Sequence, residues 1–243
     1  MIEPTSINHH IQKHIIDLLM YQKVARFRDL RPPRVDTNLF TYHLKNLVTS
    51  GFLEKIDTGY TLSTVGLSYV DRVSSEKKTI RSQPKIITML VVQNSDGDIL
   101  LQRRTKQPYI DTWTLPYGKI HIEDASVNAA AQREAYEKLG IEHQSLEHAG
   151  DCYIRVYTGE ELLSTTLAHV FRFYKNDIAP SDTLKWVRPH KLAQLQLAPA
   201  VEDVMARTFF KDPFFFEEFD VDWYSGTYES KRIPNPRTPN RQP

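Results

Sequence analysis

A charged segment that ends at a glycine constrains the fold of this chain more than any other part of the sequence. The segment REAYEKLGI, residues 133–141, follows a run of alanines, and WTLPYGKIHIED, residues 113–124, comes before it. The alanines and charged residues favour a helix over about 125–139, and a glycine is the usual C-terminal stop. Helix positions i, i+3 and i+4 share one face, so Glu134 and Glu137 are predicted to project together.

Two carboxylates on one helix face are typical of a site for a hard divalent cation. Mg²⁺ takes oxygen ligands and keeps room for water and phosphate oxygens. Such a cation neutralises the closely spaced charges of a diphosphate and acidifies a water molecule. On these residues alone an alternative stays open: an ordinary charged helix surface, with Glu134 and Lys138 as a stabilising pair four residues apart.

The whole pattern resembles the signature of the Nudix hydrolase superfamily: Gly, five residues, Glu, seven residues, then Arg-Glu-aliphatic-any-Glu-Glu-any-Gly-aliphatic. The resemblance covers roughly residues 84–209, and the matching positions are Gly118, Arg133, Glu134, Ala135, Glu137, Gly140 and Ile141. It implies metal ligation by Glu134, Glu137 and the Tyr117 carbonyl, with one of the glutamates a candidate for activating water. It also implies that Arg133 orients the catalytic glutamates by ion pairing. The implied cofactor of a catalytic form is Mg²⁺ or Mn²⁺.

Two departures from this signature bear on activity. Lys138 stands where the family has the second carboxylate of its Glu-Glu pair, which changes the local charge by two units. A cation about 4 Å from Lys138 would be repelled by about 1 kcal/mol in water and about 4 kcal/mol at an effective dielectric near 20, which predicts a weakened metal site. In addition, one extra residue separates Gly118 from Arg133, so Asp124 or Glu123 would replace the usual Glu.

Other groups near this signature suit phosphate. Lys138 is a fixed cation that can hold a phosphate without a metal. Two arginines stand at the end of a predicted strand over 99–104 and suit the same chemistry, although an ordinary solvated strand end explains them equally well. The predicted phosphate-binding residues are Lys138, Arg103, Arg104 and Gly118.

The first 80 residues follow a different pattern. Apolar spacing predicts helices over 8–20, 26–31 and 37–49, the third capped by Asp36, and then a hairpin and a last helix. This order resembles a winged helix-turn-helix domain, whose third helix enters the major groove of DNA. A protein–protein or dimerisation module is the alternative. The predicted DNA-binding residues are Asn38, Thr41, Tyr42, Lys45, Asn46, Arg28 and Arg34.

Charge and composition exclude several classes. The chain has 243 residues and one cysteine, Cys152, which excludes an intrachain disulfide. Its net charge is only +1, so no overall field attracts nucleic acid or a membrane. Residues 1–82 carry 12 Lys or Arg against 8 Asp or Glu, a mildly basic balance. No apolar run approaches the roughly 18 residues of a membrane span, and no secretion signal is recognisable. These features favour a cytoplasmic protein without a membrane partner.

The expected fold class is α+β with two domains and a tail. A winged helix-turn-helix domain is predicted over 1–80 and a Nudix α/β/α sandwich with a mixed sheet over 84–210, joined by the polar stretch 74–85. The tail, 211–243, is first aromatic and then rich in Pro, Asn and Arg. Its last ten or so residues are expected to be disordered, whereas the aromatic part is too apolar for a free tail and is predicted to pack on the rest.

Two functional hypotheses follow from this pairing of domains. It is similar to that of the Nudix-related transcriptional regulators of NAD metabolism, in which the domain order is reversed. The resemblance implies a homodimer that senses a nucleoside diphosphate derivative such as ADP-ribose, binds double-stranded DNA and hydrolyses its ligand weakly or not at all. The alternative is an active Mg²⁺-dependent hydrolase of nucleoside diphosphates linked to another moiety, with the winged helix as an accessory module. A weaker third hypothesis is an interaction protein with neither site active.

Overall fold

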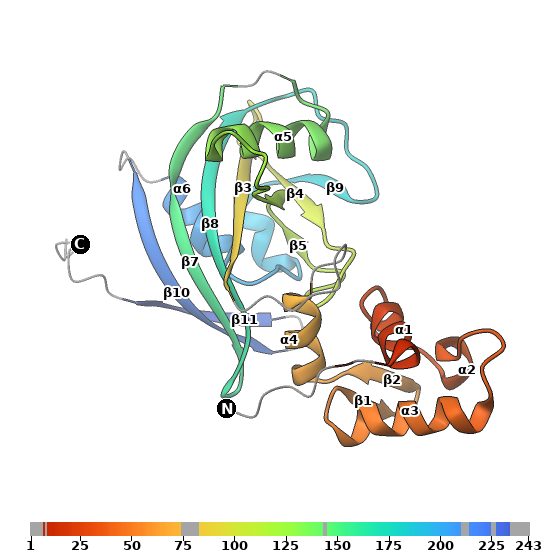
Figure 1. The fold of residues 1–243 in the computed structure, drawn as a ribbon. Helices are drawn as coiled ribbons and strands as arrows, with labels where there is room; N and C mark the ends of the chain where they lie inside the picture. Colours follow the sequence, from red (N-terminus) through yellow and green to blue (C-terminus); the bar gives the residue numbers. More distant parts are fainter. Residues whose placement is uncertain are drawn as a thin grey trace. The chain divides into compact units, whose positions relative to one another are not determined.

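The computed structural model describes residues 7, 9–73, 83–142, 145–209, 214–224 and 227–233 (Figure 1). Its contacts group into two compact units, Met1–Ser82 with Thr105–Ile110, and Gln83–Arg104 with Asp111–Pro243. Most of the predicted linker and the predicted disordered end lie outside the described residues. Within the described ranges, no helix combines the length and the apolar character needed to span a membrane.

The first unit has the element order of a winged helix-turn-helix fold. A short helix and a capped third helix precede a two-stranded hairpin, as the apolar spacing predicts. The Asp36 carboxylate accepts hydrogen bonds from the backbone N–H groups of Asn38 and Leu39 at 2.8 and 3.1 Å, which fixes where the third helix begins. The elements are α1(His10–Leu19), α2(Phe27–Leu30), α3(Thr37–Thr49), β1(Leu53–Ile56), β2(Gly59–Leu62) and α4(Thr64–Arg72).

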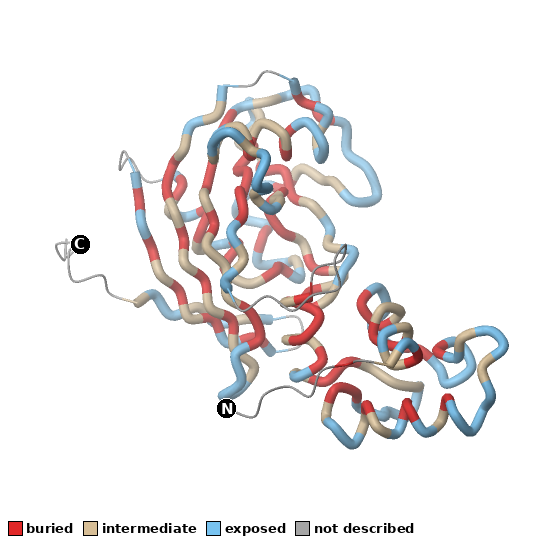
Figure 2. The backbone as a smooth tube through the Cα atoms, viewed as in Figure 1, coloured by how far each residue is buried: buried red, intermediate tan, exposed pale blue. Residues whose placement is uncertain are grey.

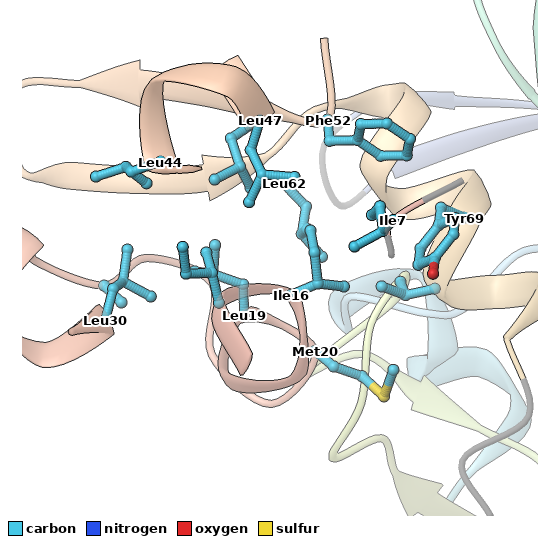
Figure 3. Packing of buried hydrophobic residues seen from close by; sticks show 14 of the residues in the cluster. Ile7, Ile16, Leu19, Met20, Leu30, Leu44, Leu47, Phe52, Leu62 and Tyr69 are labelled. Atoms are coloured by element: carbon cyan, nitrogen blue, oxygen red, sulfur yellow. The ribbon is translucent and has the colours of Figure 1, made fainter. Parts of the chain in front are cut away.

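Buried side chains from all three of the first helices form the core of this unit (Figure 3). On α3 the buried face comprises Phe40, Leu44 and Leu47, as predicted, and also His43, which is 8% exposed. The His43 ring stacks on the His9 ring, with 3.7 Å between ring centroids. Burial, and then the neighbouring histidines, lower the pKa of His43, so this position holds a neutral ring as part of the core.

The second unit is built on one nine-stranded mixed sheet with the strand order β11-β10-β7-β8-β3-β4-β5, in which β6 pairs with β3 and β9 with β4. The β3–β8 and β7–β10 pairs are parallel and the other pairs antiparallel. The strands are β3(Lys85–Gln93), β4(Ile99–Arg103), β5(Trp113–Thr114), β6(Tyr117–Lys119), β7(Glu147–Thr158), β8(Glu161–Tyr174), β9(Leu184–Val187), β10(Phe215–Tyr224) and β11(Thr227–Ile233).

Helices cover both faces of this sheet. The helix α5(Val127–Leu139) lies over one face, and α6(Val201–Thr208) lies on the opposite face, following the 3₁₀ helix η1(Pro189–Gln194) (Figure 1). Under α5 the core contains Leu90 and Val92 of β3 and Phe171 and Phe173 of β8. Figure 2 shows that buried residues follow the central strands. The fold class is therefore α+β, with an α/β/α sandwich around a mixed sheet as predicted.

The aromatic segment near the C-terminus is a strand of this sheet. Alternate residues of β10, from Phe215 through Phe219 to Trp223, are buried, and the strand pairs in parallel with β7, Phe215 facing Gly150. A Cβ built on Gly150 would lie 2.4 Å from the Phe215 backbone oxygen, so only a glycine leaves room for the added strand there. The aromatic residues are thus buried by sheet extension.

Candidate functional site

The helix α5 and the strand β6 bring one of the predicted metal ligands, Glu134, against Gly118 of the signature. The Ser126 hydroxyl accepts from the backbone N–H of Ala129 at 3.0 Å and caps α5, and Gly140, with φ of 67°, ends it in the left-handed region. Glu134, on the buried side of α5, lies directly over Gly118 of β6. A Cβ built on Gly118 would lie 1.7–2.0 Å from the Glu134 carboxylate atoms. The signature glycine is therefore required by the close approach of this carboxylate.

Arg133 organises the charges around this contact. Its Nε and Nη2 donate to the two oxygens of Asp124 at 2.9 and 2.8 Å, a bidentate geometry that fixes both groups. Its Nη1 donates to Glu134 Oε1 at 2.7 Å and makes a longer 3.4 Å contact with Glu137. The predicted orienting role of Arg133 thus has a geometric basis. Of the two candidates for the place of the usual signature Glu, Asp124 is the one that pairs with Arg133.

The same network changes the titration of its members. The hydrogen-bonded Arg133 guanidinium holds the pKa of the Asp124 carboxyl down at about 2, against an ordinary 3.8. In return the Asp124 carboxylate, more than Glu134, raises the pKa of Arg133 further above its usual range. The side chains of Asp124 and Glu134 are only 8% and 4% exposed, so this charge cluster is largely withdrawn from water.

The two carboxylate oxygens of Glu134 differ in their contacts. Oε1 accepts from Arg133, but the buried Oε2 has no hydrogen-bond partner among the residues that the structure describes. Leaving a buried charged acceptor unsatisfied costs several kcal/mol unless a partner arrives. An oxygen that lies beside the Gly118 backbone, within a set of carboxylates, suits a divalent cation. The donor set therefore fits the metal that the signature implies.

The backbone of β6 adds a second oxygen on this side. Leu90 N donates to the Pro116 carbonyl at 2.8 Å, so in the alternating antiparallel ladder the next residue, Tyr117, turns its carbonyl away from β3. The Lys119 carbonyl lies on that same side and accepts from Arg133 Nη2 at 2.9 Å. A cation would be held here by Glu134, Glu137 and the Tyr117 carbonyl, and when bound it would neutralise diphosphate charge.

The remaining charged positions of α5 are more exposed. The Glu137 side chain is 50% exposed, and Lys138 lies in the last turn of α5, also exposed. Glu134 and Lys138 are both among the described residues, and no ion pair joins them; Glu134 is paired with Arg133 instead. The ordinary surface pair considered for these residues is thus not formed.

Arg103, the last residue of β4, and Arg104, the next residue, have different environments. Arg103 is half exposed and pairs with Asp111 at 3.0 Å. Arg104 is more buried, and its Nη1 donates to the Tyr117 hydroxyl, so it supports the strand that carries Gly118. Their predicted contact with ligand phosphate stays a prediction.

An open hollow of about 580 Å³ borders the network on the far side of Arg133. Its wall comprises Gln132, Arg133, Tyr136, Ile141 and Glu142. Its volume is within the usual range for small-molecule sites, but neither Glu134 nor Glu137 lines it. The predicted metal ligands of α5 therefore do not line this hollow.

The residues predicted to bind DNA lie on the outer face of α3, in the turn before it and, for Arg28, on α2. Asn38, Tyr42 and Lys45 are exposed on this face, with Tyr42 61% exposed. Thr41 and Asn46 are half-buried, and the Thr41 hydroxyl donates to the Thr37 carbonyl at 2.7 Å. Arg28 is exposed and lies 3.4 Å from Asp29, and Arg34 is exposed with a left-handed φ of 63°.

Several solved structures are similar to part of this chain. The mutator MutT protein of Bacillus halodurans is 18% identical, with a TM-score of 0.48 over 63% of this chain and 99% of that one. The NUDIX domain of Shewanella oneidensis NrtR, solved with ADP ribose, is 17% identical, with a TM-score of 0.42 over 57% of this chain and 93% of that one. NrtR solved with a 27mer DNA is 18% identical, with a TM-score of 0.43 over 51% of this chain and 59% of that one.

The family model described as NUDIX domain matches residues 83–209. The Gly118–Glu134 contact and the whole Arg133 network lie inside this range. Since the match spans more than half of the sequence, the chain belongs to the NUDIX domain family.

Proposed function

We propose that this protein is a ligand-sensing, DNA-binding regulator whose Nudix domain binds a nucleoside diphosphate derivative such as ADP-ribose and hydrolyses it weakly or not at all. The observation that carries the binding half of this proposal is the unpartnered, buried Glu134 Oε2 beside Gly118. A divalent cation there neutralises diphosphate oxygens. The observation that favours weak turnover is Lys138, which puts a positive charge one turn of helix away from Glu134.

A second function has its own support. Glu134, Glu137 and Arg133 retain the arrangement of two carboxylates held by one guanidinium, which is what a Mg²⁺-dependent or Mn²⁺-dependent hydrolase needs for positioning a cation and water. In that case the first unit serves as an accessory module for dimerisation or for binding a protein. Calorimetric titration and a turnover assay with ADP-ribose and Mg²⁺ distinguish the two. Binding without turnover supports the regulator, and turnover that Glu134→Gln abolishes supports the hydrolase.

Replacing Lys138 with glutamate is expected to raise Mg²⁺-dependent turnover of ADP-ribose at least tenfold. The change removes a repulsion of about 1–4 kcal/mol at about 4 Å and supplies a third carboxylate on the same helix face. Turnover is measured by the release of AMP, with Lys191→Glu, an exposed lysine of η1, as the control. A Lys138→Glu variant no faster than the unchanged protein would contradict the inhibitory role of this lysine.

The DNA-binding half of the proposal depends on the outer face of α3. Replacing Lys45 with alanine is expected to weaken the binding of short labelled duplexes of mixed sequence and to reduce the slope of log affinity against log salt by about 1, the value for one lost phosphate contact. Fluorescence anisotropy at several salt concentrations measures this slope, with Lys191→Ala as the control. If duplexes bind the unchanged protein no better than they bind serum albumin, the first unit is an interaction module instead.

The proposed regulator also requires a homodimer. Ligand binding would act by changing the distance between the two DNA-binding units of the dimer. Sedimentation velocity with and without ADP-ribose measures the assembly. A monomer under both conditions would leave only the hydrolase with its accessory module.

A further inference from the structure

Two strands of the sheet bring two histidines and an aspartate together. His148 and Asp151 are on β7, and His169 is on β8. Residues three apart on a regular strand point to opposite faces, because side chains alternate. Between His148 and Gly150, however, the β7–β8 register shifts: His148 faces Phe171, and Asp151 faces His169. This bulge places both β7 side chains on the face of His169, and bulges are known to re-aim side chains in this way.

The three side chains converge on one carboxylate oxygen. His148 Nε2 lies 2.9 Å from Asp151 Oδ1, and His169 Nδ1 lies 2.7 Å from the same oxygen. One donor atom from each residue falls within 4.8 Å of the other two. The His148 ring is held by stacking on Phe171, with centroids 4.6 Å apart, and by an edge contact with Phe214 at 5.2 Å.

This donor set has the composition of a transition-metal site. Two imidazoles and one carboxylate suit zinc and its neighbours, whereas Mg²⁺ prefers oxygen alone. In a tetrahedral site, bonds of about 2.0–2.1 Å from Zn²⁺ to nitrogen and oxygen place neighbouring ligand atoms roughly 3.3–3.4 Å apart. The two ring nitrogens lie 2.9 and 2.7 Å from Asp151 Oδ1, and the three donor atoms lie within 4.8 Å of one another, so small shifts of these side chains make room for a cation.

The cluster lies on the same face of the sheet as the Gly118 site. In the strand register Gly118 faces Thr88, Thr88 faces His169, and His169 faces Asp151, so these four positions form one row across the sheet. Thr88 is fully buried, and within the described part of the chain its hydroxyl oxygen has no hydrogen-bond partner. With strands about 4.8 Å apart, the backbone of His169 lies roughly 10 Å from that of Gly118.

We propose that His148, Asp151 and His169 form a second cation site, specific for Zn²⁺ or a similar transition metal and separate from the carboxylate site on α5. Three protein ligands leave one coordination position open. In this row the open position takes water or an anionic oxygen of a bound ligand. The site depends neither on DNA binding nor on hydrolysis.

The experiment is zinc binding to the full-length protein without nucleotide. Protein in excess Mg²⁺, added to fill the oxygen-rich site on α5, is titrated with Zn²⁺ in the calorimeter and, separately, with Co²⁺, whose visible absorption reports the coordination number. We expect one Zn²⁺ or Co²⁺ per chain, and binding at least tenfold weaker in His169→Gln and in Asp151→Asn. His10→Gln is the matched control, because His10 is an exposed histidine beside His9 and should leave the affinity unchanged.

Circular dichroism and thermal unfolding of the metal-free variants show whether they fold; if His169→Gln does not, His148→Gln replaces it. No binding by the unchanged protein, or equal binding by folded His169→Gln and Asp151→Asn, overturns the proposal. Loss of binding in His10→Gln with retention in His169→Gln also overturns it, since the cation would then occupy the N-terminal histidines. Because no nucleotide is present, failure of ADP-ribose to bind leaves this result unaffected.

Discussion

Replacement of Arg133 with methionine is expected to lower the free energy of unfolding of the second unit by about 3 kcal/mol, the lower end for breaking a buried ion pair. The guanidinium is bonded to both oxygens of Asp124 and to one of Glu134, and both carboxylates are almost fully buried. Without Arg133 they stay buried with their charges uncompensated. The three tryptophans all lie in the second unit, so urea unfolding followed by tryptophan fluorescence reports on that unit alone.

A matched control uses an arginine in a more exposed pair. Arg155 is also bidentate, to Asp220 at 2.8 Å, but the two side chains are 36% and 33% exposed. Arg155→Met should therefore cost about 1 kcal/mol or less. Equal losses in the two variants would contradict the claim that burial makes the Arg133 network special.

The acid dependence of stability gives an independent check on Arg133. The pKa of Asp124 is about 2 in the folded protein against an ordinary 3.8, so the folded state favours the ionised form. The resulting stabilisation is complete above about pH 4 and is lost as the pH falls toward about 2. In Arg133→Met this contribution is absent, so its unfolding free energy should fall less steeply between about pH 5 and pH 3 than that of the unchanged protein.

Replacement of Gly118 with alanine is expected to weaken divalent-cation binding at least tenfold while leaving the fold intact. The new methyl group would occupy the position of the Glu134 carboxylate, and the carboxylate is the end of a flexible side chain that can swing away. The cation then loses its most buried ligand. Mn²⁺ binding, followed by electron paramagnetic resonance, measures this loss without requiring the identity of the organic ligand.

Gly159→Ala is the control for Gly118→Ala. Gly159 is at the β7–β8 turn with φ of 61°, and no atom lies within 4 Å of a Cβ built there. The substitution strains the turn but leaves the α5 site untouched. Should Gly118→Ala bind Mn²⁺ as tightly as Gly159→Ala does, Glu134 is not a ligand and the proposed binding mode fails.

Local signals in the sequence were sufficient for most of the elements. The side chains of Asp36 and Ser63 cap the starts of α3 and α4. Gly51 and Gly140 follow α3 and α5 with positive φ. Because these signals act over only a few residues, the helix ends can be predicted without tertiary structure. The fold class and the predicted helix 37–49 are confirmed. His43 was missing from the predicted buried face, because its burial depends on His9, more than thirty residues away in the sequence.

The site residues divide in the same way. Helix spacing was sufficient to predict the charged face of α5. Whether Asp124 or Glu123 pairs with Arg133 depends on the conformation of the loop before α5, which the sequence does not specify. The His148–Asp151–His169 cluster matches no sequence motif, because its residues come from two strands. It also depends on a β-bulge that the local sequence does not predict. Consecutive aromatic residues at 214–216 likewise hide the alternation that appears further along β10.

The strand β10 has a practical consequence for any shortened version of this protein. The family match ends at residue 209, but the parallel ladder between β10 and β7 runs from Phe215 to Asp222. Cutting the chain at the family boundary would remove β10 and leave β7 as an edge strand. Its unpaired N–H and C=O groups could then form hydrogen bonds with a strand of another copy, which promotes aggregation. A soluble fragment for crystallisation or binding work should therefore extend through Ile233.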